Sequence, residues 1–263
     1  MRCCVKPRPT PARGADYRAQ QTAILVEQAA LARQMRRWDE SVALWNRIGE
    51  EAESEHSVQL GAVFAGGLGE TWAAAGNLAR AEPLLRRSLQ LLRNDPGTAS
   101  PQVATALALL AGLYIEEDRL ALAEEPLEEA IARDEESLGP EHPQVATLLE
   151  QRAAILSRRG ESQAARDNLE RARIILSGHF GPNSITVAGV YAALGDVEQR
   201  ARQPAAAATD YGKAIGLLRD AEGGSARYRD ALEARYTSAL KAARHSGKAA
   251  GAGERALLAS GGK

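Results

Sequence analysis

Hydrophobic residues return along this chain with the period of an α-helix, in stretches of similar length that short polar turns separate. Val103, Leu107 and Tyr114 are spaced by four and then seven residues, so they share one face of a helix. The polar turn 116–119 follows, and a second apolar stripe runs over 120–131. This pattern predicts a pair of antiparallel amphipathic helices, and the same pattern covers most of the chain.

The pair recurs at a spacing of 42 residues, and similar residues keep this register in every copy. The register is carried by Ala81, Ala123, Ala165 and Ala207; by Leu85, Leu127, Leu169 and Tyr211; by Val103, Val145 and Val187; and by Gly97, Gly139 and Gly181. A helix pair cannot bury its apolar face alone, so successive pairs must stack on one another. The repeat therefore predicts an all-α solenoid of stacked antiparallel helix pairs.

Glycine and proline residues indicate where the helices begin and end. Gly139 and Pro140 should end the second helix of a pair, because glycine accepts a left-handed conformation and proline cannot continue the helix. Pro204 stands where the first residue of a helix is expected. Pro83 and Pro126 fall early inside the second helix, where we expect a late start or a slight kink.

Two segments carry a family resemblance. The segments HPQVATLLEQRAAIL (142–156) and AEPLLRRSLQLL (81–92) resemble the tetratricopeptide repeat, in the 42-residue version found in kinesin light chains and many bacterial proteins. The loop LGPEHP (138–143) is similar to the loop between repeats in that subfamily. The resemblance implies a right-handed superhelix in which the first helices line a concave surface and the second helices a convex one.

The register also divides the chain. The expected parts are a disordered basic tail over 1–18, a solenoid over 19–245 and a disordered tail over 246–263. Within the solenoid we expect a degenerate repeat over 20–56, full repeats over about 57–98, 99–140, 141–182 and 183–222, and an end helix over 228–244. The end helix would cover the apolar face of the last repeat.

Composition and charge narrow the functional classes. Alanine and leucine dominate the apolar residues, which favours helix over sheet. The chain has 33 Lys and Arg against 34 Asp and Glu, which gives no reason to expect binding to nucleic acid or membranes. No apolar run approaches the roughly 18 residues of a membrane span, and no secretory signal is visible. We expect a cytoplasmic protein, and the preference for Ala and Arg over Ile and Lys suggests a bacterial one.

Residues that could support catalysis or bind a metal do not form a recognisable motif. The histidines, His56, His142, His179 and His245, lack the spacing of a helical metal site. Cys3 and Cys4 have no second pair to complete a metal site, and an incidental position in the tail is the favoured interpretation. No phosphate-binding loop and no nucleophile with a base are present. We therefore expect no enzyme activity, no cofactor and no metal.

Glycines cluster at Gly66, Gly67 and Gly69, inside a predicted first helix. Close helix packing is the favoured explanation, and a smooth groove floor for a ligand backbone is the alternative. Proteins of the kinesin-light-chain type usually carry paired asparagines on the groove side of the first helix, which hold the backbone of an extended peptide. The matching positions here are Gly66–Gly67, Ala108–Leu109, Glu150–Gln151 and Ala192–Ala193, so those asparagines are missing.

Charge is distributed unevenly along the chain. Residues 115–141 hold eleven acidic and two basic residues, whereas 1–37 and 200–263 are mainly basic. Solvation of helix faces is the more common cause of such a run. The alternatives are a partner with a basic segment and the basic tails of this chain itself.

The resemblance places six polar residues as candidates on the concave surface. They are Glu70, Glu116, Glu150, Arg158, Asp196 and Arg200. We expect a non-catalytic adaptor or scaffold that holds a protein or peptide, with a basic or amphipathic segment, in this groove. The alternative is a regulatory receptor that senses a peptide and controls a separate effector protein.

Overall fold

The computed structural model describes residues 11–94, 100–220 and 226–260, with side chains over 17–94, 101–219 and 227–245. These ranges contain eleven helices and no strand. The helices are α1 (Pro11–Gln34), α2 (Trp38–Glu55), α3 (Val58–Ala74), α4 (Leu78–Asn94), α5 (Ser100–Glu116), α6 (Leu120–Leu138), α7 (Pro143–Arg158), α8 (Ser162–Phe180), α9 (Ile185–Arg200), α10 (Pro204–Asp220) and α11 (Ala226–Ser260). Among them, none has the length and apolarity that crossing a membrane requires.

Helices α1 and α11 reach further toward the ends of the chain than the sequence pattern predicts. Residues 11–18 and 246–260 are helical, although disorder is expected there. The second segment is rich in alanine and leucine, which favour helix even without a regular apolar stripe. Cys3, Cys4 and the remaining tail residues lie outside the described residues.

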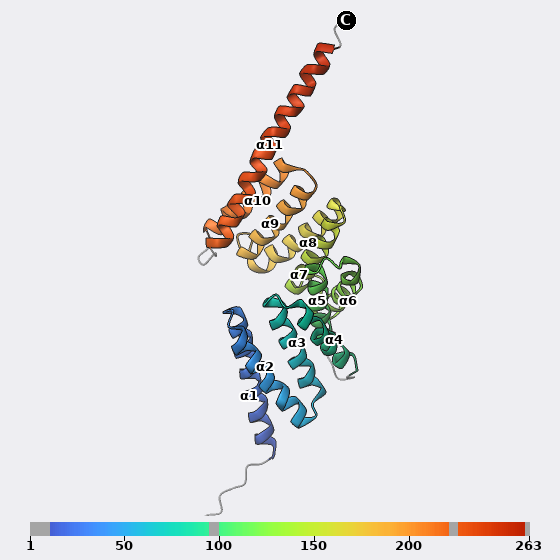
Figure 1. Cartoon of the computed structure of the whole chain (residues 1–263), viewed down its shortest axis with the longest axis vertical. Coiled ribbons are helices and arrows are strands. Elements are labelled where there is room, and N and C mark those ends of the chain that lie inside the picture. The colour runs from blue at the N-terminus through green and yellow to red at the C-terminus, as the bar shows by residue number, and fades with distance from the viewer. Residues whose placement is uncertain (1–10, 95–99, 221–225, 261–263) are drawn as a thin grey trace, which may run out of the picture. The chain divides into compact units, whose positions relative to one another are not determined.

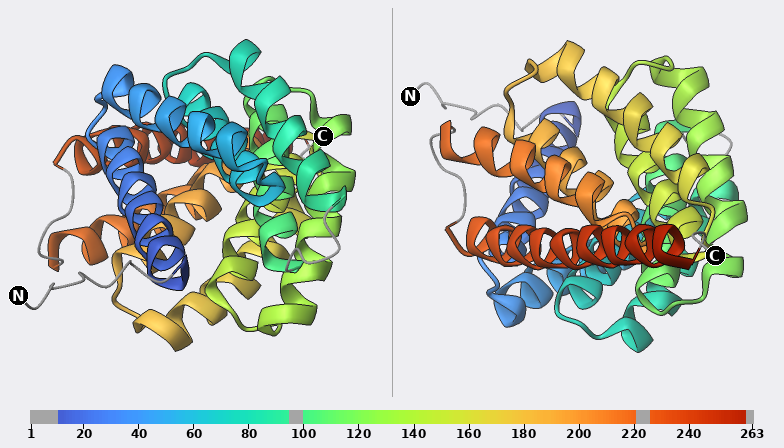
Figure 2. Two further views of the ribbon diagram at one scale, coloured as in Figure 1. Left: turned by 90° about the horizontal axis from the view of Figure 1, so that it is seen from below. Right: turned by 90° about the horizontal axis from the view of Figure 1, so that it is seen from above.

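The helices belong to two compact units, divided between Arg119 and Leu120. Unit 1 holds α1 to α5, and unit 2 holds α6 to α11. Within each unit every helix packs on the next one in the chain (Figures 1 and 2). First helices also contact one another, α1 with α3, α3 with α5, and α7 with α9. This arrangement confirms the predicted all-α class of stacked antiparallel helix pairs.

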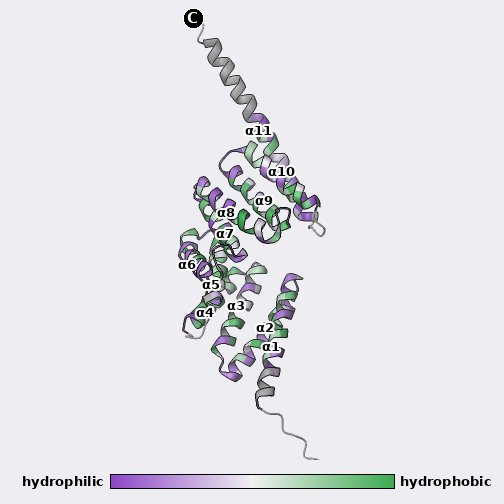
Figure 3. Cartoon of the chain, turned by 180° about the vertical axis from the view of Figure 1, so that it is seen from behind, coloured by the Kyte–Doolittle hydropathy of each residue, from purple (hydrophilic) through white to green (hydrophobic). Residues whose placement is uncertain are grey.

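The core of each pair is formed by the residues that keep the 42-residue register. Their side chains are buried in all four copies: Ala81, Ala123, Ala165, Ala207, Leu85, Leu127, Leu169 and Tyr211. Hydrophobic and hydrophilic segments are mixed along the coloured helices, as amphipathic helices require (Figure 3). The predicted apolar stripes are therefore confirmed as the buried faces.

Close packing within a pair depends on a small residue opposite a large one. A Cβ atom added to Gly195 in α9 would lie 2.6 Å from the ring of Tyr211 in α10. The corresponding atom on Gly69 in α3 would lie 2.9 Å from Leu85 in α4. Both pairs of helices therefore approach closely only because the first helix has glycine at this position.

The turn between the first and second helix of a pair has one residue with positive φ. In the first pair it is Arg36, which lies outside the 42-residue register. In the four pairs that follow, it keeps the register: Gly76, Asp118, Gly160 and Arg202, with φ of 81°, 59°, 86° and 58°. The following N–H closes the turn by bonding a carbonyl one turn back, as from Arg119 to Tyr114 at 2.8 Å. The turn is thus a structural repeat even where its residues differ.

The predicted helix boundaries agree with the structure in their main features. Gly139 and Gly181 follow the second helices with φ of 94° and 86°. Pro204 is the first residue of α10. Pro83 and Pro126 lie inside α4 and α6 and within about two turns of their starts, so each removes one hydrogen bond near the end of a helix.

Candidate partner-binding site

Four of the six candidate residues line a single pocket in unit 2. Glu150 and Arg158 extend from α7, and Asp196 and Arg200 extend from α9. The pocket has a volume of about 220 Å³. Its other lining residues are mostly small or apolar: Ala153, Ala154, Ser157, Leu169, Ala193 and Val197. The pocket is therefore a charged rim over a floor of small side chains, contributed chiefly by two first helices.

Among the ionisable residues that line this pocket, Glu150 has the most strongly shifted pKa. Its side chain is only partly exposed, and burial raises the pKa of the carboxyl to about 7, because removal from water disfavours the charged form. The positions at the same register are Gly66, Ala108 and Ala192, so a glutamate here is not required by the repeat. A cation placed next to Glu150 would favour the ionised carboxylate.

Asp196 already has two partners within unit 2. The Tyr211 hydroxyl donates a hydrogen bond to Asp196 at 2.6 Å, and Arg235 of α11 donates to both carboxylate oxygens at 2.9 and 3.1 Å. Burial, followed by the Asp196 contact, raises the pKa of Tyr211. Asp196 therefore joins α9, α10 and α11, and its structural role was not evident from the sequence.

The end helix reaches the same region through Tyr228. Burial is the main cause that raises the pKa of Tyr228. The charge of Arg235 opposes this shift, and the smaller effects of Asp196 and Glu150 add to it. The Tyr228 phenol is thus close enough to both carboxylates to sense their charge. Helix α11 consequently contributes to the surroundings of the pocket as well as covering the last pair.

The two remaining candidates lie in unit 1. Glu116 is exposed at the C-terminal end of α5. Glu70 in α3 forms an ion pair with Arg33 at 2.9 Å and lines a different pocket of about 300 Å³. That pocket is mostly apolar, and its lining residues, Trp45 and Val63 among them, come from all five helices α1 to α5. The six candidates therefore do not form one continuous site within either unit.

The glycine cluster of α3 is explained by packing at Gly67. A Cβ atom there would lie 2.0 Å from the indole of Trp45, so any side chain would displace the tryptophan. At Gly66 the nearest atom is the Ser88 hydroxyl at 3.1 Å. Trp45 is buried, and its Nε1 has no hydrogen-bond partner among the described atoms. The indole of Trp45 therefore explains why residue 67 is glycine. The repeat register does not identify this contact.

Two histidines lie at helix ends and have structural roles there. His142 caps α7, and its Nδ1 accepts a hydrogen bond from the N–H of Gln144 at 3.2 Å. His56 has a left-handed conformation at the end of α2. Over the described ranges, no group of three or more His, Cys, Asp or Glu is arranged to hold a metal ion.

A buried aspartate near His142 was missed at the sequence level. Asp134 is 4% exposed, and its Oδ1 has no hydrogen-bond partner among the described atoms. Burial raises the pKa of Asp134, and the charge of His142 opposes this shift. The repeat register could have identified it, because the corresponding positions in the other copies are all leucine: Leu92, Leu176 and Leu218.

Comparisons with known proteins agree with the fold. Residues 62–136 and 110–176 match the tetratricopeptide repeat family. None of the curated proteins matches the chain. Among solved structures, BtubC (BKLC) from P. vanneervenii is 22% identical, with 86% of this chain and 93% of that one covered and a TM-score of 0.68.

Two further structures have the same fold at lower identity. A kinesin-light-chain-type protein from Podosopora anserina with nearly identical TPR-like repeats is 19% identical, with coverage of 75% and 94% and a TM-score of 0.63. The apo form of RapI is 12% identical, with coverage of 76% and 70% and a TM-score of 0.63. Residues 62–176 therefore match the tetratricopeptide-repeat family, and the chain has the fold of the solved kinesin-light-chain-type structures.

Proposed function

We propose that the protein is a non-catalytic adaptor that holds a segment of a partner protein against the pocket of α7 and α9. Tetratricopeptide repeats are generally non-catalytic scaffolds and bind proteins or peptides. The observation that carries the proposal is the pocket lined by Glu150, Arg158, Asp196 and Arg200. Its small floor residues leave room for a side chain, and its rim offers both signs of charge.

A segment with a lysine or arginine suits Glu150 best. A partly buried carboxyl with a pKa near 7 is held partly in its neutral form at physiological pH. A lysine or arginine side chain next to Glu150 would favour the ionised carboxylate and so lower the pKa of Glu150. Binding of a basic segment should therefore strengthen as pH rises from about 6 to 8, because less of the carboxyl must first lose a proton.

The test uses the full chain as bait in a lysate of its host. A bait with Glu150→Lys would carry the opposite charge in the pocket, and Glu161→Lys makes the same change at the exposed residue just before α8. We expect a partner that wild type and Glu161→Lys retain and that Glu150→Lys loses. Glu150→Gln should remove the increase in affinity between pH 6 and 8.

Three measurements would argue against the proposal. The first is an unchanged set of captured proteins with a Glu150→Lys bait that keeps its helical circular dichroism and melting temperature. The second is loss of the partner with Glu116→Lys alone, which would assign the site to unit 1. Retention of only a short peptide, without a folded partner, would favour the regulatory receptor.

A further inference from the structure

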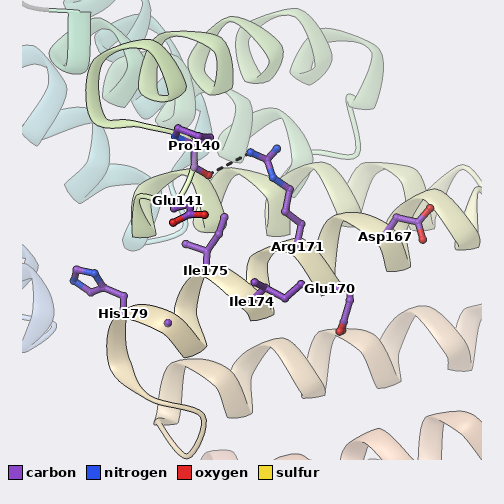
Figure 4. Close-up of a pocket in the computed structure, with 9 residues that line it drawn as sticks. Pro140, Glu141, Asp167, Glu170, Arg171, Ile174, Ile175 and His179 are labelled. Carbon is purple, nitrogen blue, oxygen red and sulfur yellow. Dashed lines mark hydrogen bonds between the residues drawn. The ribbon is translucent and has the colours of Figure 1, made fainter.

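A second pocket of unit 2 lies between α8 and the loop that joins α6 to α7. It has a volume of about 760 Å³ and shares no lining residue with the pocket of α7 and α9. Pro140 and Glu141 come from the loop, and the other lining residues come from α8 (Figure 4). From Asp167 to His179 these residues follow one side of α8 at helical spacing, a length of about 18 Å at 1.5 Å per residue.

The outer side of α8 is more apolar than the same side of the other second helices. Ile174 is 60% exposed, although isoleucine is among the residues most often buried in folded proteins. At the same register the chain has Gln90, Ala132 and Gly216, none of which is a large hydrophobic residue. Internal packing does not explain Ile174, because most of its side chain faces solvent.

Gly178 is a second departure from the register on this side of α8. The corresponding residues are Asn94, Glu136 and Asp220, all polar. A Cβ atom at Gly178 would meet no other atom within 4 Å, so the fold itself does not need glycine here. Its effect is to leave the pocket without the polar side chain that the other copies carry.

A second exposed apolar residue lies at the end of the helix, outside the pocket. Phe180 is 51% exposed, and its ring meets the edge of the His179 ring with centroids 4.7 Å apart. His179 in turn lines the pocket. Phe180 is six residues from Ile174, which places the two side chains about 120° apart around α8, so Ile174 is the exposed apolar residue of the pocket face.

The charge around the pocket is negative. Arg171, its only basic lining residue apart from His179, is bound to Glu135 at 2.7 Å and to the Pro140 carbonyl at 3.3 Å. Glu170 is neutralised by Arg173, which donates to it at 2.9 Å. Glu141 and Asp167 remain as carboxylates without a cation among the described side chains.

We propose that this face of α8 docks an amphipathic helix of a partner protein, with an apolar side chain against Ile174 and with Lys or Arg toward Glu141 and Asp167. The residues that line the pocket follow α8 for about three turns, which matches the contact length of a bound helix. The uncompensated carboxylates select a basic partner by charge complementarity. The site lies on the second helices of the repeat and is separate from the pocket in which Glu150 lies.

The test measures binding of a labelled peptide to the full chain by fluorescence anisotropy. The probe is a designed helix of about 18 residues with leucine on one face and lysine on the other. Its control peptides replace lysine by glutamate or scramble the same residues. We expect the Lys/Leu helix to bind and both control peptides to bind at least about tenfold more weakly.

Matched variants place the peptide on α8. Ile174→Gln introduces the residue found at this register in α4, and we expect it to weaken binding about fivefold to tenfold. Leu122→Gln changes another exposed aliphatic residue of unit 2, which does not line the pocket, and should leave binding unchanged. Glu141→Gln should weaken binding and reduce its salt dependence, whereas Glu161→Gln should do neither.

Several outcomes would overturn the assignment. Equal loss with Ile174→Gln and Leu122→Gln would mean that the peptide binds without regard to site. Equal binding of the Lys and Glu peptides would remove the role of charge. Absence of peptide binding, together with self-association that Ile174→Gln abolishes in sedimentation, would show that a second copy of the chain occupies this face instead.

Discussion

One backbone conformation recurs in the turn that joins the helices of each pair, and it is occupied by different residue types. Gly76 and Gly160 adopt it without strain, whereas Asp118 and Arg202 place a side chain at positive φ. For a residue with a Cβ atom this conformation costs about 1 kcal/mol. The turns at Asp118 and Arg202 are therefore less stable than they would be with the glycine that other copies have at this position.

Arg202→Gly should increase the free energy of unfolding by about 0.5–1 kcal/mol, since relief of strain exceeds the added flexibility of the unfolded chain. Urea denaturation would measure the change. Ala234→Gly, at an exposed position inside α11, is the matched control and should lower stability by about 1 kcal/mol. A similar loss in both variants would mean that the Arg202 side chain stabilises the turn by contacts of its own.

Asp134 illustrates the opposite situation, in which a single polar residue weakens a core position. Leucine occupies this register in three other copies, and Oδ1 of Asp134 is buried without a partner. Asp134→Leu should increase the free energy of unfolding by about 1–3 kcal/mol. Because the pKa of Asp134 is raised in the folded protein, wild type is most stable below the unfolded pKa and loses stability as pH rises through the folded one.

The gain from Asp134→Leu should therefore be larger at pH 8 than at pH 4, and denaturation at both values would measure it. His142 opposes the shift, so the difference is reduced where the imidazole is protonated. Leu176→Asp places the same carboxyl in α8 and serves as the reverse control. Destabilisation by Asp134→Leu at either pH would mean that the carboxylate makes a necessary contact with the loop at His142.

Helix α11 acts as the cover of the last pair, and its apolar residues should matter more than its ion pair. Leu232 is 1% exposed in the same cluster as Tyr211, whereas Arg235 and Asp196 are both about half exposed. Leu232→Ala should lower stability by about 2–4 kcal/mol, but Arg235→Ala by less than about 1 kcal/mol. Hydrogen exchange would locate the effect, with faster exchange in α11 and α10 for Leu232→Ala.

Since repeats stabilise mainly their neighbours, exchange in α7 should change little in the Leu232→Ala variant. Faster exchange throughout unit 2 would instead indicate that the unit unfolds in one cooperative step. An Arg235→Ala loss as large as that of Leu232→Ala would show that the Asp196 network, rather than apolar burial, holds α11 in place.

Across the whole chain, the sequence predicted what periodicity determines and missed what single contacts determine. The 42-residue register identified the buried Ala and Leu columns, because each copy must solve the same packing problem. It could not predict the division at Arg119, which falls inside the expected repeat 99–140, or that Asp196 is bound by Arg235. These features depend on residues that differ between copies, so a repeated pattern carries no information about them.

The pairing of Gly195 with Tyr211 has a consequence for recombining these repeats. At the same register of unit 2, Ala153 accompanies Leu169 and Gly195 accompanies Tyr211, so the larger residue in α10 goes with the smaller one in α9. A chimera that moved α10 behind α7 would place the tyrosine ring where a methyl group already stands. Helix pairs can therefore be exchanged as modules, whereas single helices cannot, and the pair is the natural unit for engineering longer or shorter arrays from this chain.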